Sequence, residues 1–143
     1  MAPLSNGGGR PPASNLEIIF SDWLDAIRTG DLDRLAARIT PETTHRGVRP
    51  ELICANGAEV IANARGTSEQ LPQVDAVELI ASGDKVVLGV RSPDIGQPGI
   101  EELQGQVYLV FALRDGLITE IRDYLTRAEA LAAAGAGAQP DWR

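Results

Sequence analysis

Cysteine and histidine are almost absent from this sequence. Cys54 is the only cysteine among 143 residues, which excludes an internal disulfide and fits a reducing cytoplasm. His45 is the only histidine, and one histidine with no cysteine or second histidine nearby does not make a metal site. The sequence therefore predicts a cytoplasmic protein that holds no metal.

Long apolar runs and phosphate-binding motifs are also missing. No run approaches the roughly 20 apolar residues of a membrane span, and the N-terminus lacks the hydrophobic segment of a signal peptide. The glycines of N-G-G-G-R, residues 6–10, have no strand before them and no apolar helix directly after them, so they do not form a phosphate loop. We expect no membrane association and no bound cofactor.

Basic residues are scarce relative to acidic ones. The chain has 13 Lys and Arg against 20 Asp and Glu, and its net charge of -7 argues against nucleic-acid binding, which needs a basic patch. With 43% hydrophobic and 23% charged residues, the composition is that of one soluble globular domain with a sizeable core.

A predicted β-hairpin, residues 106–125, organises the chain. Asp115-Gly116 lies between two apolar halves, and this dipeptide is the strongest short-range signal for a hairpin. We expect strands at about 105–114 and 117–126, the first apolar on both faces and therefore central. In the second strand, alternation puts Asp123 on the apolar face with Thr119, Ile121 and Leu125.

The rest of the chain predicts helices first and strands later. Ser14 and Glu17 form a capping box that starts a helix, and Gly30 suits its left-handed end. Helices before a meander of four long strands indicate an α+β domain over residues 14–134, between a disordered tail at 1–13 and a flexible tail at 135–143. The other expected elements are helices at 32–39, 58–64 and 128–134, strands at 43–48, 74–81 and 85–91, and loops at 49–56 and 92–102.

Two segments resemble a known superfamily. The pattern G-x-I-x-x-x-R-D-Y, from Gly116 to Tyr124, and the phrase A-I-R-T-G-D-L-D-R-L, residues 26–35, are similar to segments of the nuclear transport factor 2-like (NTF2-like) superfamily. SnoaL-like polyketide cyclases, ketosteroid isomerases and limonene epoxide hydrolases belong to it. The resemblance covers about residues 15–134. It implies a cone-shaped, curved antiparallel or mixed β-sheet that wraps around N-terminal helices and encloses an apolar pocket, and it implies a homodimer.

Asp123 is the first candidate for chemistry. A partly desolvated carboxylate has a raised pKa, which suits general acid–base work near neutral pH. In the limonene epoxide hydrolases, the aspartate of the matching R-D-Y motif is catalytic. Alternatively, Asp123 pairs with Arg46 or Arg91 and only holds the sheet together.

The epoxide hydrolase reaction itself is disfavoured. That family carries an Arg-x-Asp pair two strands earlier, and the matching positions here are Val90 and Ser92. Only Asp123 of the catalytic triad remains, so no second carboxylate is left to protonate an epoxide. Ketosteroid isomerases place an aspartate in the first-strand region, where residues 40–50 offer only Glu42.

His45 is the second catalytic candidate, because histidine is the residue type suited to proton transfer near neutral pH and because His45 lies where the superfamily lines its pocket mouth. An exposed histidine at a strand end is the alternative. Cys54 is interpreted as a small buried apolar residue. The expected substrate-binding residues are Tyr108, Trp23, Arg46 and Val90, although Trp23 also fits a place in the core.

Three functions remain open from the sequence. The first is a cofactor-independent isomerase, cyclase or hydrolase that acts on an apolar substrate by acid–base chemistry at Asp123, with His45. The second is a binding protein for a small apolar ligand, without turnover. The third is an interaction module whose sheet serves dimerisation.

Overall fold

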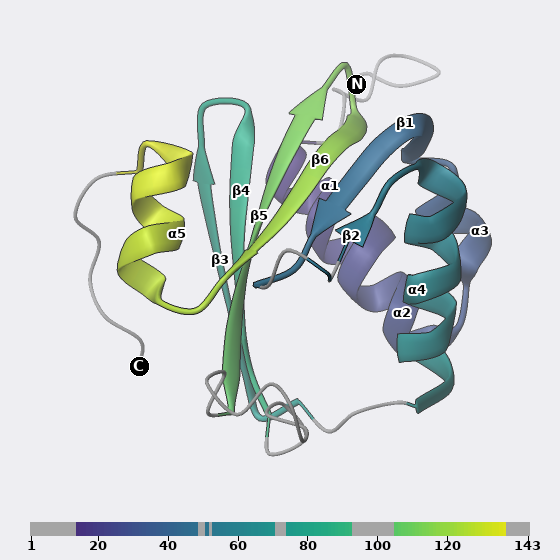
Figure 1. Cartoon of the computed structure of the whole chain (residues 1–143), viewed down its shortest axis with the longest axis horizontal. Coiled ribbons are helices and arrows are strands. Elements are labelled where there is room, and N and C mark those ends of the chain that lie inside the picture. The colour runs from purple at the N-terminus through teal and green to yellow at the C-terminus, as the bar shows by residue number, and fades with distance from the viewer. Residues whose placement is uncertain (1–13, 49–50, 52, 71–73, 93–104, 137–143) are drawn as a thin grey trace, which may run out of the picture.

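A mixed sheet of six strands forms the centre of the molecule (Figure 1). The computed structural model describes residues 14–48, 51, 53–70, 74–92 and 105–136. The strands follow the order β2-β1-β6-β5-β4-β3, and every neighbouring pair is antiparallel except β1 with β6. Their bounds are β1 Ile39–Arg46, β2 Ile53–Cys54, β3 Ala76–Ser82, β4 Lys85–Arg91, β5 Gln106–Arg114 and β6 Leu117–Tyr124.

Helices cover both faces of the sheet, but unequally. The first four helical segments and α4 pack on one face, and α5 packs on the other (Figure 1). The α+β architecture expected from the element order is therefore confirmed. The helical bounds are α1 Asn15–Ile18, η1 Ile19–Asp25, α2 Ala26–Thr29, α3 Leu32–Ala36, α4 Gly57–Gln70 and α5 Arg127–Ala134.

The first helix runs through α1, η1 and α2. It begins as predicted at Ser14, whose hydroxyl accepts from the Glu17 N–H at 3.2 Å while its own N–H donates to the Glu17 carboxylate at 2.9 Å. Gly30 ends it at φ 78°. Its middle, η1, is π-helical, a widened turn that is frequent at functional sites, and it buries Trp23.

The second helix and the first strand differ from the prediction. The helix ends at Ala36 rather than near residue 39, and β1 begins at Ile39 and runs through Pro41. Pro41 is tolerated because it lies where the pairing of β1 with β6 is irregular, and because the described part of β2 pairs only with the far end of β1. The Thr43 hydroxyl bridges an irregularity there, since it accepts from Thr40 N–H at 2.8 Å and donates to the carbonyl of Ile118 at 2.6 Å. The expected loop at 49–56 also contains the short strand β2.

The predicted helix at 58–64 is longer than expected, because α4 runs from Gly57 through Gly66 to Gln70. Asn56 caps it by accepting from the Glu59 N–H at 3.0 Å. Gly57 lies so close to β1 that a Cβ at this position would be 2.0 Å from the carbonyl oxygen of Thr40. Gly57 thus fixes how closely α4 approaches the sheet, whereas Gly66 is simply tolerated within the helix.

The central hairpin is confirmed, with one addition. Asp115 and Gly116 have φ values of 53° and 78°, as a two-residue turn of type I′ requires, and β5 lies in the middle of the sheet. The pairing shifts after the turn, from Leu113 opposite Ile118 to Ala112 opposite Glu120. Thr119 is therefore a β-bulge and is exposed, while Ile118 and Ile121 on either side of it are fully buried.

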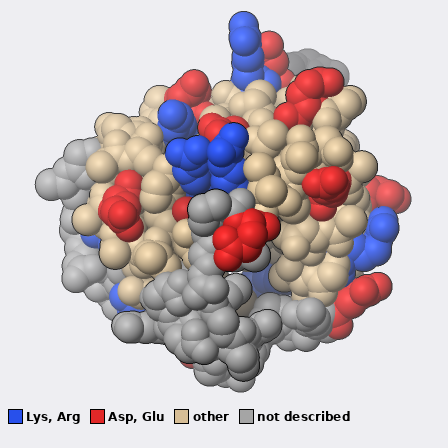
Figure 2. Space-filling model, in the orientation of Figure 1, with Lys and Arg blue, Asp and Glu red and all other residues tan. Residues whose placement is uncertain are grey.

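The sheet separates two cores. The larger one lies between the sheet and the N-terminal helices, and the smaller one lies beneath α5. Two hydrogen bonds of 2.9 and 2.8 Å from Arg127 to Glu78 tie α5 to β3. The rest of this outer face carries exposed charges, among them Arg46 and Arg122, which are neighbours on β1 and β6. Figure 2 shows basic groups gathered near the middle of the view with acidic groups around them.

Several sequence-based expectations lie outside the described residues. They are the disordered tail at 1–13, most of the tail at 135–143 and the loop after Ser92. Within the described part of the chain, no helix is long and apolar enough to cross a membrane.

Two glycine substitutions in α4 test the close approach of this helix to β1. Gly57→Ala is expected to lower the free energy of unfolding by about 1–3 kcal/mol, because the added Cβ meets a backbone oxygen and the helix must move. Gly66→Ala is the matched control in the same helix. It has nothing within 4 Å of the added Cβ and should raise the free energy of unfolding by about 0.5–1 kcal/mol. Urea denaturation measures both, and equal effects of the two substitutions would contradict this account of the packing.

Candidate functional site

A cavity of about 290 Å³ lies between the N-terminal helices, α4 and the sheet. Most of its wall is apolar, and the polar groups are few, as in typical small-molecule sites. The lining residues are Trp23, Leu24, Ile27 and Arg28 from the first helix, Asn63, Ala64 and Thr67 from α4, and His45, Val74, Leu88, Val90, Val107, Leu109 and Asp123 from the sheet side.

His45 and Asp123 meet in the wall of this cavity. His45 is opposite Ile121 in the parallel pairing of β1 with β6, so its side chain points to the same face as Ile121 and Asp123. The Nε2 atom of His45 and the Oδ1 atom of Asp123 are 2.7 Å apart. The two candidates that the sequence named separately therefore form one hydrogen-bonded pair, and Asp123 is paired with a histidine rather than with Arg46 or Arg91.

The pair is only partly shielded from solvent. The side chain of His45 is 11% exposed and that of Asp123 is 21% exposed, so Asp123 is the more accessible partner. The second carboxylate oxygen of Asp123 has no hydrogen-bond partner among the described residues. Asp123 therefore offers a free carboxylate oxygen at the cavity, while its other oxygen is held.

The hydrogen-bonding pattern indicates which nitrogen of His45 carries the hydrogen. Nδ1 of His45 is buried and has no partner in the described part of the chain. A hydrogen on Nε2 can be donated to the carboxylate and leaves only a lone pair at Nδ1, whereas a buried N–H without an acceptor would be unfavourable. The neutral Nε2–H form, donating to Asp123, fits this site.

Aromatic packing fixes the ring of His45. Trp23 lies edge-on to His45 with ring centroids 6.4 Å apart, and it also meets Phe111 edge-on at 5.1 Å. Trp23 is 6% exposed, so it belongs to the core and lines the cavity at the same time. Trp23 and Val90, two of the residues expected to bind substrate, therefore lie in the cavity wall.

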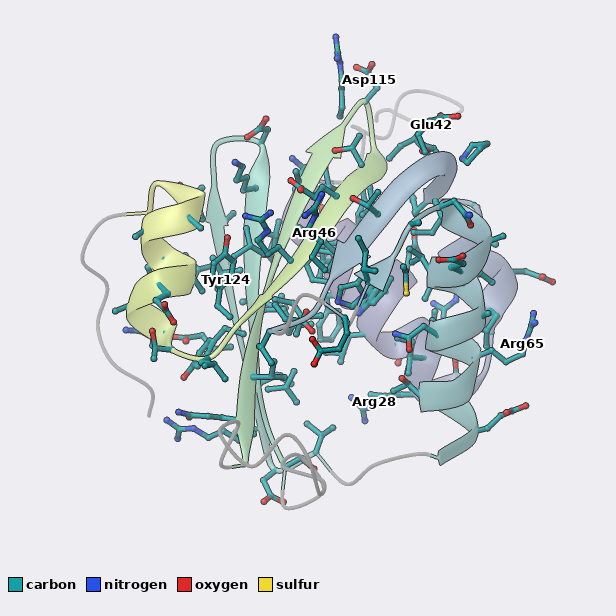
Figure 3. The ribbon with its side chains drawn as sticks, viewed as in Figure 1. Arg28, Glu42, Arg46, Arg65, Asp115 and Tyr124 are labelled. Atoms are coloured by element: carbon teal, nitrogen blue, oxygen red, sulfur yellow. The ribbon has the colours of Figure 1, made fainter. Side chains whose placement is uncertain are left out.

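Tyr108 and Arg46 do not line this cavity, contrary to expectation. Counted from the turn without a bulge, Tyr108 would be opposite Asp123 and share its face. The extra residue at Thr119 moves the register, so that Tyr108 is opposite Tyr124 and lies buried beneath α5 on the other face. Arg46 follows His45 directly in β1 and is therefore exposed on the outer face (Figure 3).

Sequence reasoning missed Arg28 and Asn63. Arg28 lies one turn after Leu24, at the edge of the apolar stripe of the first helix, and Asn63 lies one turn after Val60 on α4. Their helical spacing from an inward-facing residue is the sequence signal that could have found them. Asn63 also lines a second hollow of about 350 Å³, which shares His45 and Asp123 with the first; its other lining residues are Gly47, Glu51, Ile53 and Cys54.

The described cavity wall does not supply the second carboxylate that the epoxide hydrolase reaction needs. Among the described residues that line the apolar cavity, Asp123 is the sole carboxylate. Within the described ranges, no three His, Cys, Asp or Glu side chains are arranged to hold a metal ion.

Comparisons with known proteins identify the fold. No protein-family description and no curated protein matches the sequence. Solved structures do match. A SnoaL-like protein of unknown function from Burkholderia thailandensis aligns with a TM-score of 0.59 and 15% identity over 79% of this chain and 98% of its own.

Two further neighbours have names that propose an activity. A protein from Pseudomonas putida proposed to be a polyketide cyclase aligns with a TM-score of 0.59 and 12% identity, over 86% of this chain and 99% of its own. A protein from Kribbella flavida proposed to be a ketosteroid isomerase aligns with a TM-score of 0.54 and 14% identity, over 76% of each chain. The fold of this chain is thus NTF2-like, as its motifs predicted, while identities this low establish the fold alone.

Cys54 reports on the electrostatics of the site. Partial burial raises the pKa of its thiol, and the nearby carboxylates of Glu59 and Asp123 raise it further, because all three disfavour the thiolate. We therefore expect slow alkylation of this single cysteine near neutral pH. Asp123→Asn removes one of the negative charges, lowers the pKa of the thiol and should speed alkylation by iodoacetamide at a fixed, mildly alkaline pH.

Glu59→Gln and Asp115→Asn are the two comparison variants for the alkylation rate of Cys54. Glu59 raises the pKa of the Cys54 thiol more than Asp123 does, so its neutralisation should speed alkylation more. Asp115, at the tip of the hairpin and not among the groups that shift the Cys54 pKa, is the control and should leave the rate unchanged. If Asp123→Asn had no effect, the carboxylate would lie too far from the thiol to support this geometry.

Proposed function

We propose that this protein binds a small apolar molecule in the cavity and moves a proton on it with Asp123, without a cofactor. One observation carries the proposal: Asp123 lines an apolar cavity and is hydrogen-bonded to His45 through one oxygen, while its other oxygen has no hydrogen-bond partner among the described residues. A carboxylate so placed is both oriented and available, which are the two requirements of a general base.

The proton transfer follows from this geometry. The free oxygen of Asp123 takes a proton from a carbon or hydroxyl of the substrate, and the bonding electrons remain on the substrate as an enolate or phenolate. The resulting carboxylic acid then returns the proton to another atom, which regenerates the carboxylate. Isomerisation, ring closure and elimination all fit this cycle, and none needs an oxidant or reductant.

His45 supports the reaction as a positioning residue. Its Nε2–H holds Oδ1 of Asp123, and Trp23 packs against its ring, so the carboxylate has one preferred orientation. His45→Gln, whose amide can still donate a hydrogen bond, should keep more of the activity than His45→Leu, which cannot. Two structural neighbours are proposed to be a polyketide cyclase and a ketosteroid isomerase, and both activities are consistent with this class of reaction.

Two alternatives to catalysis remain from the sequence. A non-catalytic binding protein would use the same cavity without proton transfer. An interaction module would use the outer sheet face, part of which α5 covers and part of which carries the neighbouring charges of Arg46 and Arg122. The paired carboxylate inside the cavity favours the enzyme, and the homodimer stays a prediction.

A generic substrate for base catalysis tests the proposal. A nitro-substituted benzisoxazole loses its ring C–H proton to a base, the C–H electrons form the nitrile, and the N–O bond breaks to release a coloured phenolate. We expect the protein to accelerate this elimination above the buffer rate. Asp123→Asn should lower kcat/KM by about 100-fold or more, which is the usual contribution of a general base.

Matched variants make the result decisive. Asp115→Asn is the same substitution far from the cavity, where an asparagine tolerates the positive φ, and it should retain full activity (Figure 3). Asp123→Asn should remain folded and lose only about 1 kcal/mol of stability, since its amide oxygen still accepts from His45 in a weaker, neutral hydrogen bond. Equal rates for Asp123→Asn and the wild type would refute the catalytic role and leave the binding protein as the better description.

A further inference from the structure

Arg28 is a cation in the wall of a mostly apolar cavity. It comes from α2 and lines the same cavity as Asp123. In Figure 3 it lies between the sheet and α4, whereas Arg65 extends from the other side of α4. Among the described residues of the cavity wall, Arg28 and Asp123 are the two with full charges, and the charges are opposite.

Nearby carboxylates are already engaged with other arginines. The ion pairs are Arg38–Asp22 at 2.8 Å, Arg34–Asp25 at 3.1 Å and Arg34–Asp31 at 3.0 Å. Arg28 has no carboxylate partner in the part of the chain that the structure describes. In a protein with a net charge of -7, an arginine that lines a cavity and lacks such a partner is available to pair with an anion that enters the cavity.

The cavity itself restricts what this anion can be. About 290 Å³ holds about ten non-hydrogen atoms, at roughly 30 Å³ for each water-sized group. Most of these atoms must be apolar to match Leu24, Val90, Val107 and Leu109 in the wall. A planar guanidinium matches the fork of a carboxylate and can bind it through two parallel hydrogen bonds.

The two charges also set the orientation of the ligand. A carboxylate placed at Asp123 would face a like charge, whereas the same group at Arg28 would be attracted. We propose that the cavity takes a small apolar carboxylic acid, with its carboxylate on Arg28 and the rest of the molecule extending towards Asp123. This inference rests on the proposed function, because it assumes that the cavity binds a mostly apolar molecule. It adds that the molecule carries a carboxylate and that Arg28 recognises this group.

Arg28 should act mainly on specificity. It is an exposed residue, so solvent and salt weaken its attraction for a carboxylate. An ion pair of this kind accounts for about a fivefold difference in affinity. The apolar wall supplies the remaining affinity, which a neutral molecule of the same shape would share.

Octanoate and octanamide make the test, because they have the same shape and size and differ in charge. Isothermal titration calorimetry at low salt measures the affinity of each. We expect the wild type to bind octanoate about fivefold more tightly than octanamide and this preference to shrink at high salt. In Arg28→Gln the preference should disappear while the affinity for octanamide is kept. Arg65→Gln, the same substitution on the outer side of α4, should behave as the wild type.

The outcomes separate this inference from the function on which it rests. Equal binding of the two probes by the wild type would overturn the carboxylate preference and leave the apolar cavity in place. A preference that survives in Arg28→Gln would overturn the role of Arg28. Failure of both probes to bind would overturn the inference together with the binding part of the proposed function, while the elimination assay would still judge Asp123 separately.

Discussion

The parallel pairing of β1 with β6 is the constraint on which the candidate site depends. It brings His45 to Asp123 across 78 positions of sequence, and no local preference of either segment would do so. Contacts near the start of β1 hold the register: the N–H of Ile118 donates to the carbonyl of Arg38 at 2.7 Å, and the buried Thr43 hydroxyl donates to the carbonyl of Ile118 at 2.6 Å. If β1 slipped by one residue against β6, His45 would point to the outer face and an adjacent residue of β1 would take its place beside Asp123. The hydrogen-bonded pair is therefore a consequence of strand register.

Features with local causes could be predicted from the sequence. The capping box at Ser14, the left-handed Gly30 and the turn at Asp115-Gly116 each depend on residues within a few positions, and all three are present. The NTF2-like fold also follows from motifs that extend over short segments. By contrast, the close approach of α4 to β1 depends on how Gly57 packs against Thr40, and the course of β1 through Pro41 depends on how the neighbouring strands pair with it.

The candidate site could be predicted only in part, and the bulge at Thr119 explains why. Alternation along β6 correctly put Asp123 on the inward face, because this part of the strand is regular. Alternation failed to place Tyr108, which lies on β5. The extra residue near the turn shifts the pairing of β5 with β6 by one position, so Tyr108 points to the opposite face from Asp123. The hydrogen bond between His45 and Asp123 and the position of Arg28 at the cavity depend on contacts between distant elements. The sequence therefore named His45 and Asp123 as candidates without showing that they meet.

The central claim is that His45 donates through Nε2 to Asp123 inside the cavity. A long-range proton–nitrogen correlation spectrum of the imidazole tests it directly, and the single histidine needs no assignment. At a pH where the ring is neutral, we predict one fixed tautomer with the hydrogen on Nε2 and a bare Nδ1, as the hydrogen bond of 2.7 Å requires. Two rapidly exchanging tautomers, as in a solvent-exposed histidine, or a hydrogen fixed on Nδ1 would contradict the account.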